Sequence, residues 1–397
     1  MPSAPLALTA LAVLAARAAA IELPLGAGKA WYQQAYPVPY FTAARVRPID
    51  FLIDAVCLSL ALLYLVMHRI GRARNRTLAQ TWADLAAPML RNEFASVGKG
   101  REIGAEGEET LVWNGGAEAV MYATGRRGVD SMHAGFKLKP LHDPLALLYN
   151  FAGDVIAASG TSSIRDQLIL HFALPYQQPD NISGVFAVVA KDALRRTRAG
   201  RFDLTFAKLA DDAEAKKRGL AENFSILSEA ADLSDSLLSE KVGVVEVLNG
   251  PAGHLLDSLV LSDQPQEKPE DGPQPVEKRR RMLVLTLKAP RNAAQARDSL
   301  ALVEAACNIA DAIELGTAKL REITVTKLRR TRADVDKQLQ EEATKEQREE
   351  EEEARLNAKA KAAKDKMAGL SEKEQARRKE IERKRQMKKQ GKSTKVR

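Results

Sequence analysis

A single apolar run constrains the fold of this chain more than any other feature. Residues 49–67 read IDFLIDAVCLSLALLYLVM and contain no Lys or Arg. About 20 such residues, wound into a helix, cross the apolar core of a bilayer while satisfying their own backbone hydrogen bonds. We therefore predict one transmembrane helix over 49–67, with the rest of the chain divided between the two sides of a membrane.

Two carboxylates, Asp50 and Asp54, stand at the start of this run. Asp54 lies one turn inside it, where a charged group is costly if it faces lipid. One reading makes Asp54 a contact to another membrane helix, and the other places it at the level of the lipid headgroups. The sequence leaves both readings open, and Asp54 is kept as a candidate contact to a membrane partner.

The charges that flank the run predict its orientation. Arg69, Arg72, Arg74 and Arg76 follow it closely, and cytosolic flanks carry an excess of Lys and Arg. Two arginines on the other flank weaken this asymmetry without reversing it. We expect the N-terminus in the lumen and residues 68–397 in the cytosol.

The residues before the run divide into two short parts. Residues 1–20 are predicted to be a signal peptide, because 4–20 are apolar and end in small residues. Residues 21–48 form a short luminal segment in which Trp31, Tyr32 and Tyr36 favour the boundary between membrane and water.

Residues 77–330 have the mixed pattern of a globular α+β domain, because strands and helices occur without strict alternation. Asn114-Gly115-Gly116 predicts a hairpin, and Asp143-Pro144 predicts the start of a helix that runs to about residue 155. Asp192 and Ser234 are expected to cap two further helices. Strands are predicted over 129–138, 166–174, 184–190, 255–261 and 281–289, an exposed Pro-rich loop over 263–278, and helices over 292–315 and 317–330.

The last segment, 331–397, is a charged helical tail. It has few large apolar residues, and the acidic run 349–353 precedes several lysines, so charge pairs support a solvated helix. No sustained apolar stripe favours a self-dimerising coiled coil. The whole chain carries a net charge of +8, whereas residues 377–397 hold eleven Lys or Arg against two Glu. The basic character of the chain is therefore concentrated at one end.

Clustered basic residues bind polyanions by releasing counterions, and for a cytosolic tail the polyanion is RNA or anionic lipid. Since the tail has no aromatic residue to stack on bases, binding is expected to read the RNA backbone and not its sequence. The candidate ribosome- and RNA-binding residues are Arg377, Arg378, Lys379, Arg383, Lys384, Arg385, Lys388, Lys389, Lys392, Lys395 and Arg397.

No catalytic or metal-binding motif emerges from the rest of the chain. The two cysteines, Cys57 and Cys307, are far apart, which excludes a disulfide framework and a cysteine-based zinc site. The five histidines have no metal-ligand spacing, and Gly98-Lys99-Gly100 misses the dinucleotide-binding spacing. We predict a protein that is not an enzyme, with no catalytic residue, no metal site and no small-molecule substrate.

Several stretches resemble the calumin family, the coiled-coil-domain-containing membrane proteins of the endoplasmic reticulum, in a shortened form similar to fungal members. The most specific are GLAENFSILSEAADLSDSLLSEKV (219–242) and RMLVLTLKAP (281–290). LRNEFASVG (90–98), YATGR (122–126), LVLSDQP (259–265) and the charged tail add to them.

This resemblance implies a single-pass scaffold in the endoplasmic reticulum membrane. Its expected partners are the ribosome through its RNA, the translocation channel and a small membrane chaperone subunit, with which it assists the insertion of multi-spanning proteins. The alternative is calcium binding and calcium homeostasis, which the resemblance also implies. Calcium takes six to eight oxygen ligands, whereas residues 21–48 contain one acidic residue, Glu22. No cofactor is therefore expected, and calcium stands on the resemblance alone.

Overall fold

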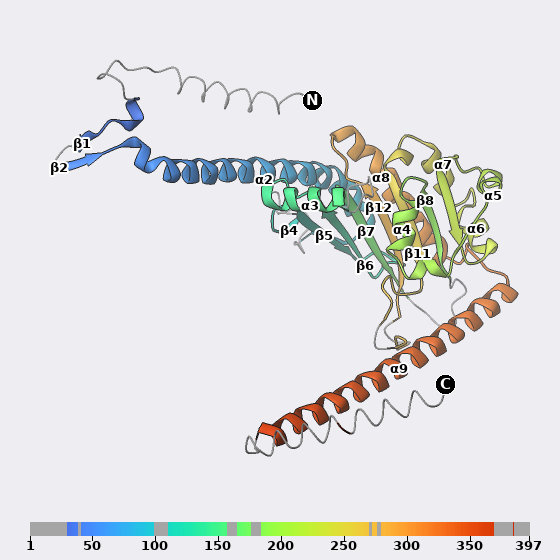
Figure 1. Cartoon of the computed structure of the whole chain (residues 1–397). Helices are drawn as coiled ribbons and strands as arrows, with labels where there is room; N and C mark the ends of the chain where they lie inside the picture. The colour runs from blue at the N-terminus through green and yellow to red at the C-terminus, as the bar shows by residue number, and fades with distance from the viewer. Residues whose placement is uncertain are drawn as a thin grey trace. The chain divides into compact units, whose positions relative to one another are not determined.

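The computed structural model describes residues 30–38, 41–98, 110–156, 165–175, 184–269, 272–275, 279–368 and 384 (Figure 1). The predicted signal peptide lies outside these residues. The chain forms two compact units. Unit 1 takes in the described parts of Met1–Asp84, Leu111–Met121 and Gly135–Gln167, and unit 2 takes in those of Leu85–Thr110, Tyr122–Ala134 and Leu168–Arg397.

Unit 1 begins with a small hairpin that precedes the long helix. Strands β1 (Tyr36–Val38) and β2 (Phe41–Val46) pair antiparallel, and two 3-10 turns, η1 (Trp31–Gln33) and η2 (Pro48–Phe51), flank them. Helix α2 then runs without interruption from Leu52 to Glu93. At 1.5 Å per residue it is about 63 Å long, which is roughly twice the thickness of a bilayer core.

Helix α2 therefore continues well beyond the predicted span. After His68 its buried side chains recur every three or four residues, at Asn75, Ala79, Trp82 and Ala86, which is the spacing of one helix face. This part of the helix is rich in Arg, Ala and Leu, and these residues favour helix. Trp82 and Phe136 meet edge to face in the core of unit 1, with their ring centroids 5.5 Å apart.

The predicted hairpin at Asn114 is present. Strand β4 (Val112–Asn114) pairs antiparallel with β5 (Glu118–Thr124), in the register Val112 to Val120. Gly115 takes a φ of +80° in the turn, a conformation that favours glycine. Strand β6 (Ser131–Lys137) follows, and its buried and exposed residues alternate as in a strand with one covered face.

Ten described strands form the large sheet. Its order is β3-β5-β6-β7-β12-β11-β8-β10-β9, with β4 added on β5. The remaining strands are β3 (Ser96–Val97), β7 (Gln167–Leu174), β8 (Phe186–Ala190), β9 (Lys208–Leu209), β10 (Phe224–Ser228), β11 (Leu256–Ser262) and β12 (Arg281–Lys288).

The centre of unit 2 is apolar on both faces of the sheet. Every residue of β8 and β11 is buried, and β11 pairs antiparallel with both β8 and β12. Helix α8 (Ala293–Glu314) packs against β12 through a stripe that includes Leu302 and Ile309. Asn292 caps this helix by accepting a hydrogen bond of 2.8 Å from the Gln295 backbone N–H. The mixed α and β fold is confirmed.

The two predicted caps in unit 2 are wrong. Helix α4 (Leu194–Ala199) begins after Ala193 without a side-chain cap, and Asp192 lies 3.3 Å from Lys288 instead. Ser234 is buried inside α6 (Ala231–Leu237). The single helix expected after Ser234 is divided, because the chain turns at Gly243 with a φ of +73° before α7 (Val244–Asn249).

Short elements complete unit 2. They are α5 (Asp212–Lys217), which contacts β10, and the 3-10 turns η3 (Asp203–Thr205) and η4 (Gly253–Leu255). Helix α9 (Glu322–Ala368) is the longest in the described chain. In unit 1, α3 (Pro144–Ile156) begins as predicted, and the Asp143 carboxylate accepts hydrogen bonds from the backbone N–H groups of Leu145 and Ala146.

Candidate functional site

The first half of α2 carries apolar side chains on all of its faces. Within the described chain, Pro48–Glu93 is the helix that is long and apolar enough to cross a membrane, and its apolar window has no buried residue. Ile53 is 74% exposed and Leu58 is 73% exposed. Such a continuous apolar surface is unfavourable in water and fits a bilayer core of about 30 Å.

Immediately after the apolar run, α2 docks on its own unit. The backbone of Leu141 lies so close to Gly71 that a Cβ there would meet the Leu141 carbonyl oxygen at 2.2 Å. One turn earlier, Nδ1 of His68 lies 3.2 Å from the carbonyl oxygen of His142, and the two imidazole rings meet edge to face. Glycine is therefore required at position 71 for the close approach of two backbones.

One turn further along α2, Asn75 strengthens this contact. Its buried side-chain amide donates hydrogen bonds to the carbonyl oxygens of Gly116 at 2.9 Å and Lys139 at 3.0 Å. A buried amide with two partners is stabilising, whereas an unpaired one is costly. Arg76 lies over the Trp113 ring at 5.7 Å. These contacts hold the helix beyond the candidate span in one orientation within unit 1.

Asp54, the candidate membrane-partner contact, is exposed in the first turn of α2. A carboxylate near a helix N-terminus is favoured by the helix dipole. This position therefore gives Asp54 a local stabilisation that needs no partner. A contact to another membrane helix and a position at the lipid headgroups are both compatible with this location.

Helix α9 carries the first part of the predicted charged tail. Of the eleven basic candidates, Lys384 alone lies among the described residues, and it is exposed. The other ten lie outside them. From Gln347 to Ala358 every side chain of α9 is exposed, so none of them is buried against the described part of unit 2.

The base of α9, in contrast, is fixed by a buried ion cluster. Arg332 makes two hydrogen bonds to Glu229, at 3.0 and 2.6 Å, and two to Asp263, at 3.1 and 2.8 Å. All three side chains are less than 10% exposed. Burial opposes the charge on Arg332, but Asp263 and Glu229 outweigh it and raise the pKa of the guanidinium. Two bidentate pairs of this kind fix geometry as well as charge.

A second ion pair holds the start of α9. Arg321 donates from Nε to Asp232 at 2.8 Å, and the Thr324 hydroxyl donates to the same carboxylate at 2.5 Å. These hydrogen bonds, that of Arg321 first, lower the pKa of Asp232 to about 2. The carboxylate therefore stays charged well into the acid range.

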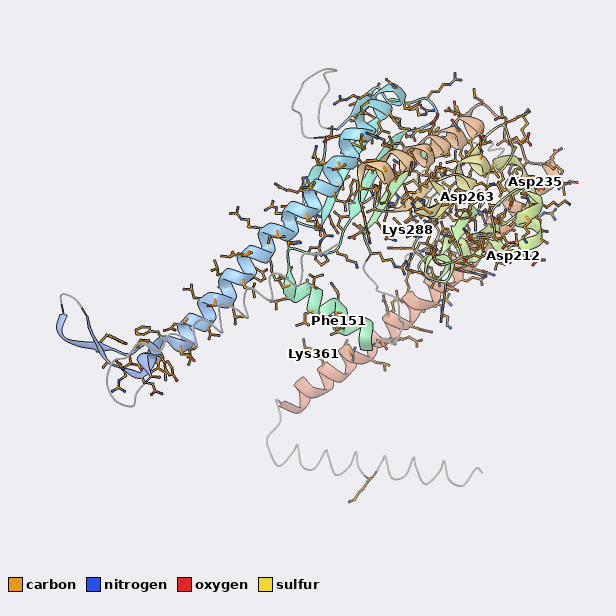
Figure 2. The ribbon with its side chains drawn as sticks, turned by 90° about the horizontal axis from the view of Figure 1, so that it is seen from above. Phe151, Asp212, Asp235, Asp263, Lys288 and Lys361 are labelled. Carbon is orange, nitrogen blue, oxygen red and sulfur yellow. The ribbon has the colours of Figure 1, made fainter. Side chains whose placement is uncertain are left out.

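The Pro-rich loop between β11 and β12 lies along the next turns of α9. Its Lys268 lies 2.7 Å from Glu342, and Arg279, at its end, donates to Asp336 at 2.6 Å. Gly272 is buried next to Ala343. The predicted loop thus has exposed residues but also packs along α9. Asp263, labelled in Figure 2, lies at its start.

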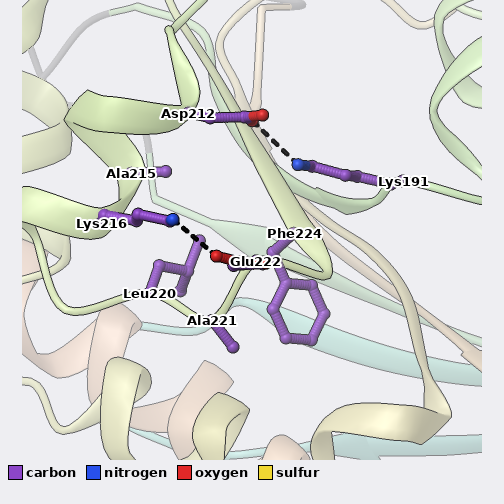
Figure 3. Close-up of a pocket in the computed structure, with 8 residues that line it drawn as sticks. All are labelled: Lys191, Asp212, Ala215, Lys216, Leu220, Ala221, Glu222 and Phe224. Atoms are coloured by element: carbon purple, nitrogen blue, oxygen red, sulfur yellow. Dashed lines mark ion pairs between the residues drawn. The ribbon is translucent and has the colours of Figure 1, made fainter.

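A small hollow lies beside α5 and β10 (Figure 3). Its volume is about 220 Å³, and its charged lining forms two ion pairs, Lys191 with Asp212 at 2.9 Å and Lys216 with Glu222 at 2.5 Å. The hydrogen bond within the second pair raises the pKa of Lys216 and lowers that of Glu222. These groups neutralise one another, so the hollow presents no unpaired charge for acid–base chemistry.

Two further observations bear on chemistry. Across the part of the chain that the structure describes, no group of three or more His, Cys, Asp or Glu could hold a metal ion. Cys307 is buried, and this burial raises the pKa of its thiol to about 11. Since the thiolate is the reactive form, Cys307 is an inert core residue near neutral pH.

The sequence did not reveal the ion cluster at the base of α9. Leu328, Arg332, Leu339 and Ala343 are buried on one face of the helix, and a charged residue in that series looks like a break in an apolar stripe. The spacing of Leu328, Leu339 and Ala343 was a weak signal that one face of this helix is buried.

Comparison with known proteins gives one consistent result. The family model for PAT complex subunit CCDC47 matches residues 50–389. A UPF0674 endoplasmic reticulum membrane protein of Schizosaccharomyces pombe is 25% identical over 223 residues, which are 55% of this chain and 56% of that protein. PAT complex subunit CCDC47 of Danio rerio is 25% identical over 240 residues, 58% of this chain and 45% of that protein.

The chain thus spans about half the length of these two curated relatives. The family match covers all but the first residue of the candidate span, the parts of both units that lie within 50–389, and helix α9. It confirms the resemblance drawn from the sequence. The chain belongs to the family of PAT complex subunit CCDC47, whose two relatives here are named as an endoplasmic reticulum membrane protein and a PAT complex subunit.

Proposed function

We propose that this protein is a non-enzymatic scaffold of the endoplasmic reticulum membrane that assists the insertion and folding of multi-spanning membrane proteins. It would do so by joining a membrane subunit complex to a ribosome engaged with the translocation channel. The observation that carries the proposal is helix α9, which is held at its base by buried Arg332 and has only exposed side chains from Gln347 to Ala358. In the sequence, the basic tail follows this helix.

The length of α9 and the charge of the tail both support this proposal. The α9 residues from Gln347 to Ala368 extend about 33 Å at 1.5 Å per residue. The tail that follows carries the concentrated positive charge of the chain. A firmly held base with a long charged arm can present that charge to a polyanion away from the domain surface. We propose ribosomal RNA as this polyanion, which is the partner that the sequence resemblance implies.

The proposal requires residues 68–397 on the cytosolic side. Arg69, Arg72 and Arg74 are exposed just after the candidate span, and this basic flank supports that orientation. Two triplets of the glycosylation-acceptor type, Asn181-Ile182-Ser183 and Asn223-Phe224-Ser225, provide a test, because glycosylation occurs only in the lumen. Asn223 is exposed. We expect no endoglycosidase-sensitive sugar on Asn223 or Asn181. Sugar at either position would show that the orientation is inverted.

Ribosome docking is tested by co-sedimentation of the full-length protein in detergent across a salt series. Replacing Arg383, Lys384 and Arg385 by Ala should lower the slope of log affinity against log salt by about two to three, if all three contact phosphate. A matched control removes three exposed basic residues from unit 2, through Arg195→Ala, Arg198→Ala and Lys208→Ala, and should leave that slope unchanged.

Two results would contradict ribosome docking. One is an equal loss of binding in the tail variant and in the control variant, which would indicate a general effect of net charge. The other is recruitment of the protein to anionic liposomes through the tail, without any ribosome pelleting, since Lys and Arg also bind anionic headgroups.

The membrane partner is tested at Asp54. The change Asp54→Leu should leave insertion intact, because it makes the helix more apolar. We expect it to reduce co-purification of the membrane chaperone subunit. Unchanged recovery of that subunit would show that Asp54 lies at the headgroups and makes no contact with a partner.

A further inference from the structure

Helix α3 in unit 1 exposes an apolar face that no described element of that unit covers. Leu145 is 69% exposed, Leu148 65%, Tyr149 79% and Phe151 67%. With 3.6 residues per turn, these side chains fall within an arc of about 160°. Phe151 is labelled on this helix in Figure 2. Contiguous exposed apolar side chains of this kind mark a contact surface.

The opposite face of α3 is the one that meets the protein. Ala146, Leu147 and Asn150 are only half exposed, and they lie on the arc that the four large apolar residues leave free. The first two turns of the helix are therefore partly covered on the less apolar side, whereas Gly153 on the same side is exposed. Its more apolar side faces outward, which is the reverse of the arrangement in a helix that covers a soluble core.

The start of α3 is fixed at the level where the candidate span ends. His142 contacts His68, and Leu141 is in backbone contact with Gly71. These α2 residues lie one to four positions after Met67, so they are at most about 6 Å beyond the apolar run. The headgroup zone on each side of a bilayer is about 5–7 Å deep. The first turn of α3 follows immediately and is held by its Asp143 cap.

We propose that α3 lies in the interface of the same bilayer that α2 crosses, with Leu145, Leu148, Tyr149 and Phe151 inserted at the boundary of headgroups and acyl chains. Tyrosine favours this boundary, where its ring is in apolar surroundings and its hydroxyl is in water. The inference rests on α2 crossing the membrane and is independent of ribosome docking.

The residue types predict how α3 binds. From Pro144 to Gly153 the helix contains no Lys, Arg, Asp or Glu. Its attachment therefore depends on burial of apolar surface and not on attraction to anionic lipid. It should persist in neutral phosphatidylcholine and at high salt. Such conditions abolish binding by a polybasic tail, so the two membrane-binding modes can be separated.

The test uses the full-length protein reconstituted in phosphatidylcholine liposomes. Cys57→Ser removes the exposed cysteine, and buried Cys307 is left in place. Tyr149→Cys or Asn150→Cys is then labelled with an environment-sensitive fluorophore, so that two adjacent residues on opposite faces are compared. Spin-labelled lipid should quench the probe at position 149 severalfold more strongly than the probe at position 150, at low and at high salt.

Each other outcome overturns the proposal. Equal quenching by lipid at the two positions would show that the exposed face does not enter the bilayer. A probe at position 149 that is shielded from aqueous iodide but is not quenched by lipid would show that a protein surface covers α3. Ribosome co-sedimentation of the same labelled variants reports on docking separately, so failure of one proposal is distinguishable from failure of the other.

Discussion

The buried ion cluster at the base of α9 allows a quantitative test of how the tail is held. Arg332 satisfies two carboxylates, Glu229 and Asp263, that are less than 10% exposed. The change Arg332→Met keeps an unbranched apolar stem but removes the guanidinium and its charge. It leaves two carboxylates buried next to one another without a cation. Removing one partner of a buried ion pair costs about 3–5 kcal/mol.

This cost is large enough to measure in the intact protein. One kcal/mol lowers the melting temperature of a domain of 150–250 residues by about 2–4 °C, so Arg332→Met should lower that of unit 2 by roughly 6–20 °C. Thermal unfolding of the full-length protein in detergent, followed by circular dichroism, measures the change. Arg330 is exposed two residues earlier, and Arg330→Met is the matched control, with an expected effect within about 0.5 kcal/mol.

A rescue variant separates the loss of charge pairing from the loss of packing. In the Arg332→Met background, Glu229→Gln and Asp263→Asn remove the two uncompensated charges while keeping the shape of the site. Most of the cost of breaking a buried ion pair comes from the buried charge that is left uncompensated, and the two amide variants remove that charge. We expect the triple variant to recover most of the lost stability. If Arg332→Met melts like the wild type, or if the triple variant is no more stable than the single one, the cluster does not hold α9.

Two further predictions concern contacts in the two units. Gly71→Ala should destabilise unit 1 by about 1–3 kcal/mol, because the added Cβ meets the Leu141 carbonyl oxygen. Thermal unfolding measures this loss, with Ala73→Ser at an exposed position as the control. Equal melting temperatures for the two variants would refute the prediction. Because Arg321 holds the pKa of Asp232 at about 2, below its usual 3.8, the pair stabilises the fold above pH 4 and loses this effect as pH falls toward 2. The difference in melting temperature between wild type and Asp232→Asn should shrink over that range, and a constant difference would contradict the assignment.

The sequence predicted correctly those elements that depend on a few neighbouring residues. The apolar run gave the candidate span because its composition leaves few alternatives, and Asn114-Gly115-Gly116 gave the β4–β5 hairpin because its turn requires a positive φ at Gly115. Asp143 gave the start of α3 because its carboxylate can reach the first free N–H groups of a helix.

The two predicted caps failed because tertiary structure places each residue elsewhere. Asp192 has a carboxylate suited to a helix cap, yet it pairs with Lys288, which is 96 residues away in sequence. Ser234 has a suitable hydroxyl, yet it is a buried residue in the middle of helix α6. Propensity describes what a residue can do locally, and tertiary contacts decide which option is taken.

The candidate sites were predictable to different degrees. The span follows from composition, whereas the cluster at Arg332 depends on Glu229 and Asp263, which are 103 and 69 residues away. No local pattern carries that information. The role of the basic tail stays a prediction, because ten of its eleven candidate residues lie outside the described chain.

The docking of α2 at Gly71 and Asn75 has a mechanical consequence. If the candidate span crosses the membrane, its helix is clamped at Gly71 and Asn75, within about three turns of the end of the apolar run, and the span and the rest of unit 1 must then rotate together. A neighbouring membrane helix that rotates the span would then rotate unit 1 through nearly the same angle. The short, stiff connection therefore converts an event among lipids into a change of orientation outside them, without the need for a flexible joint.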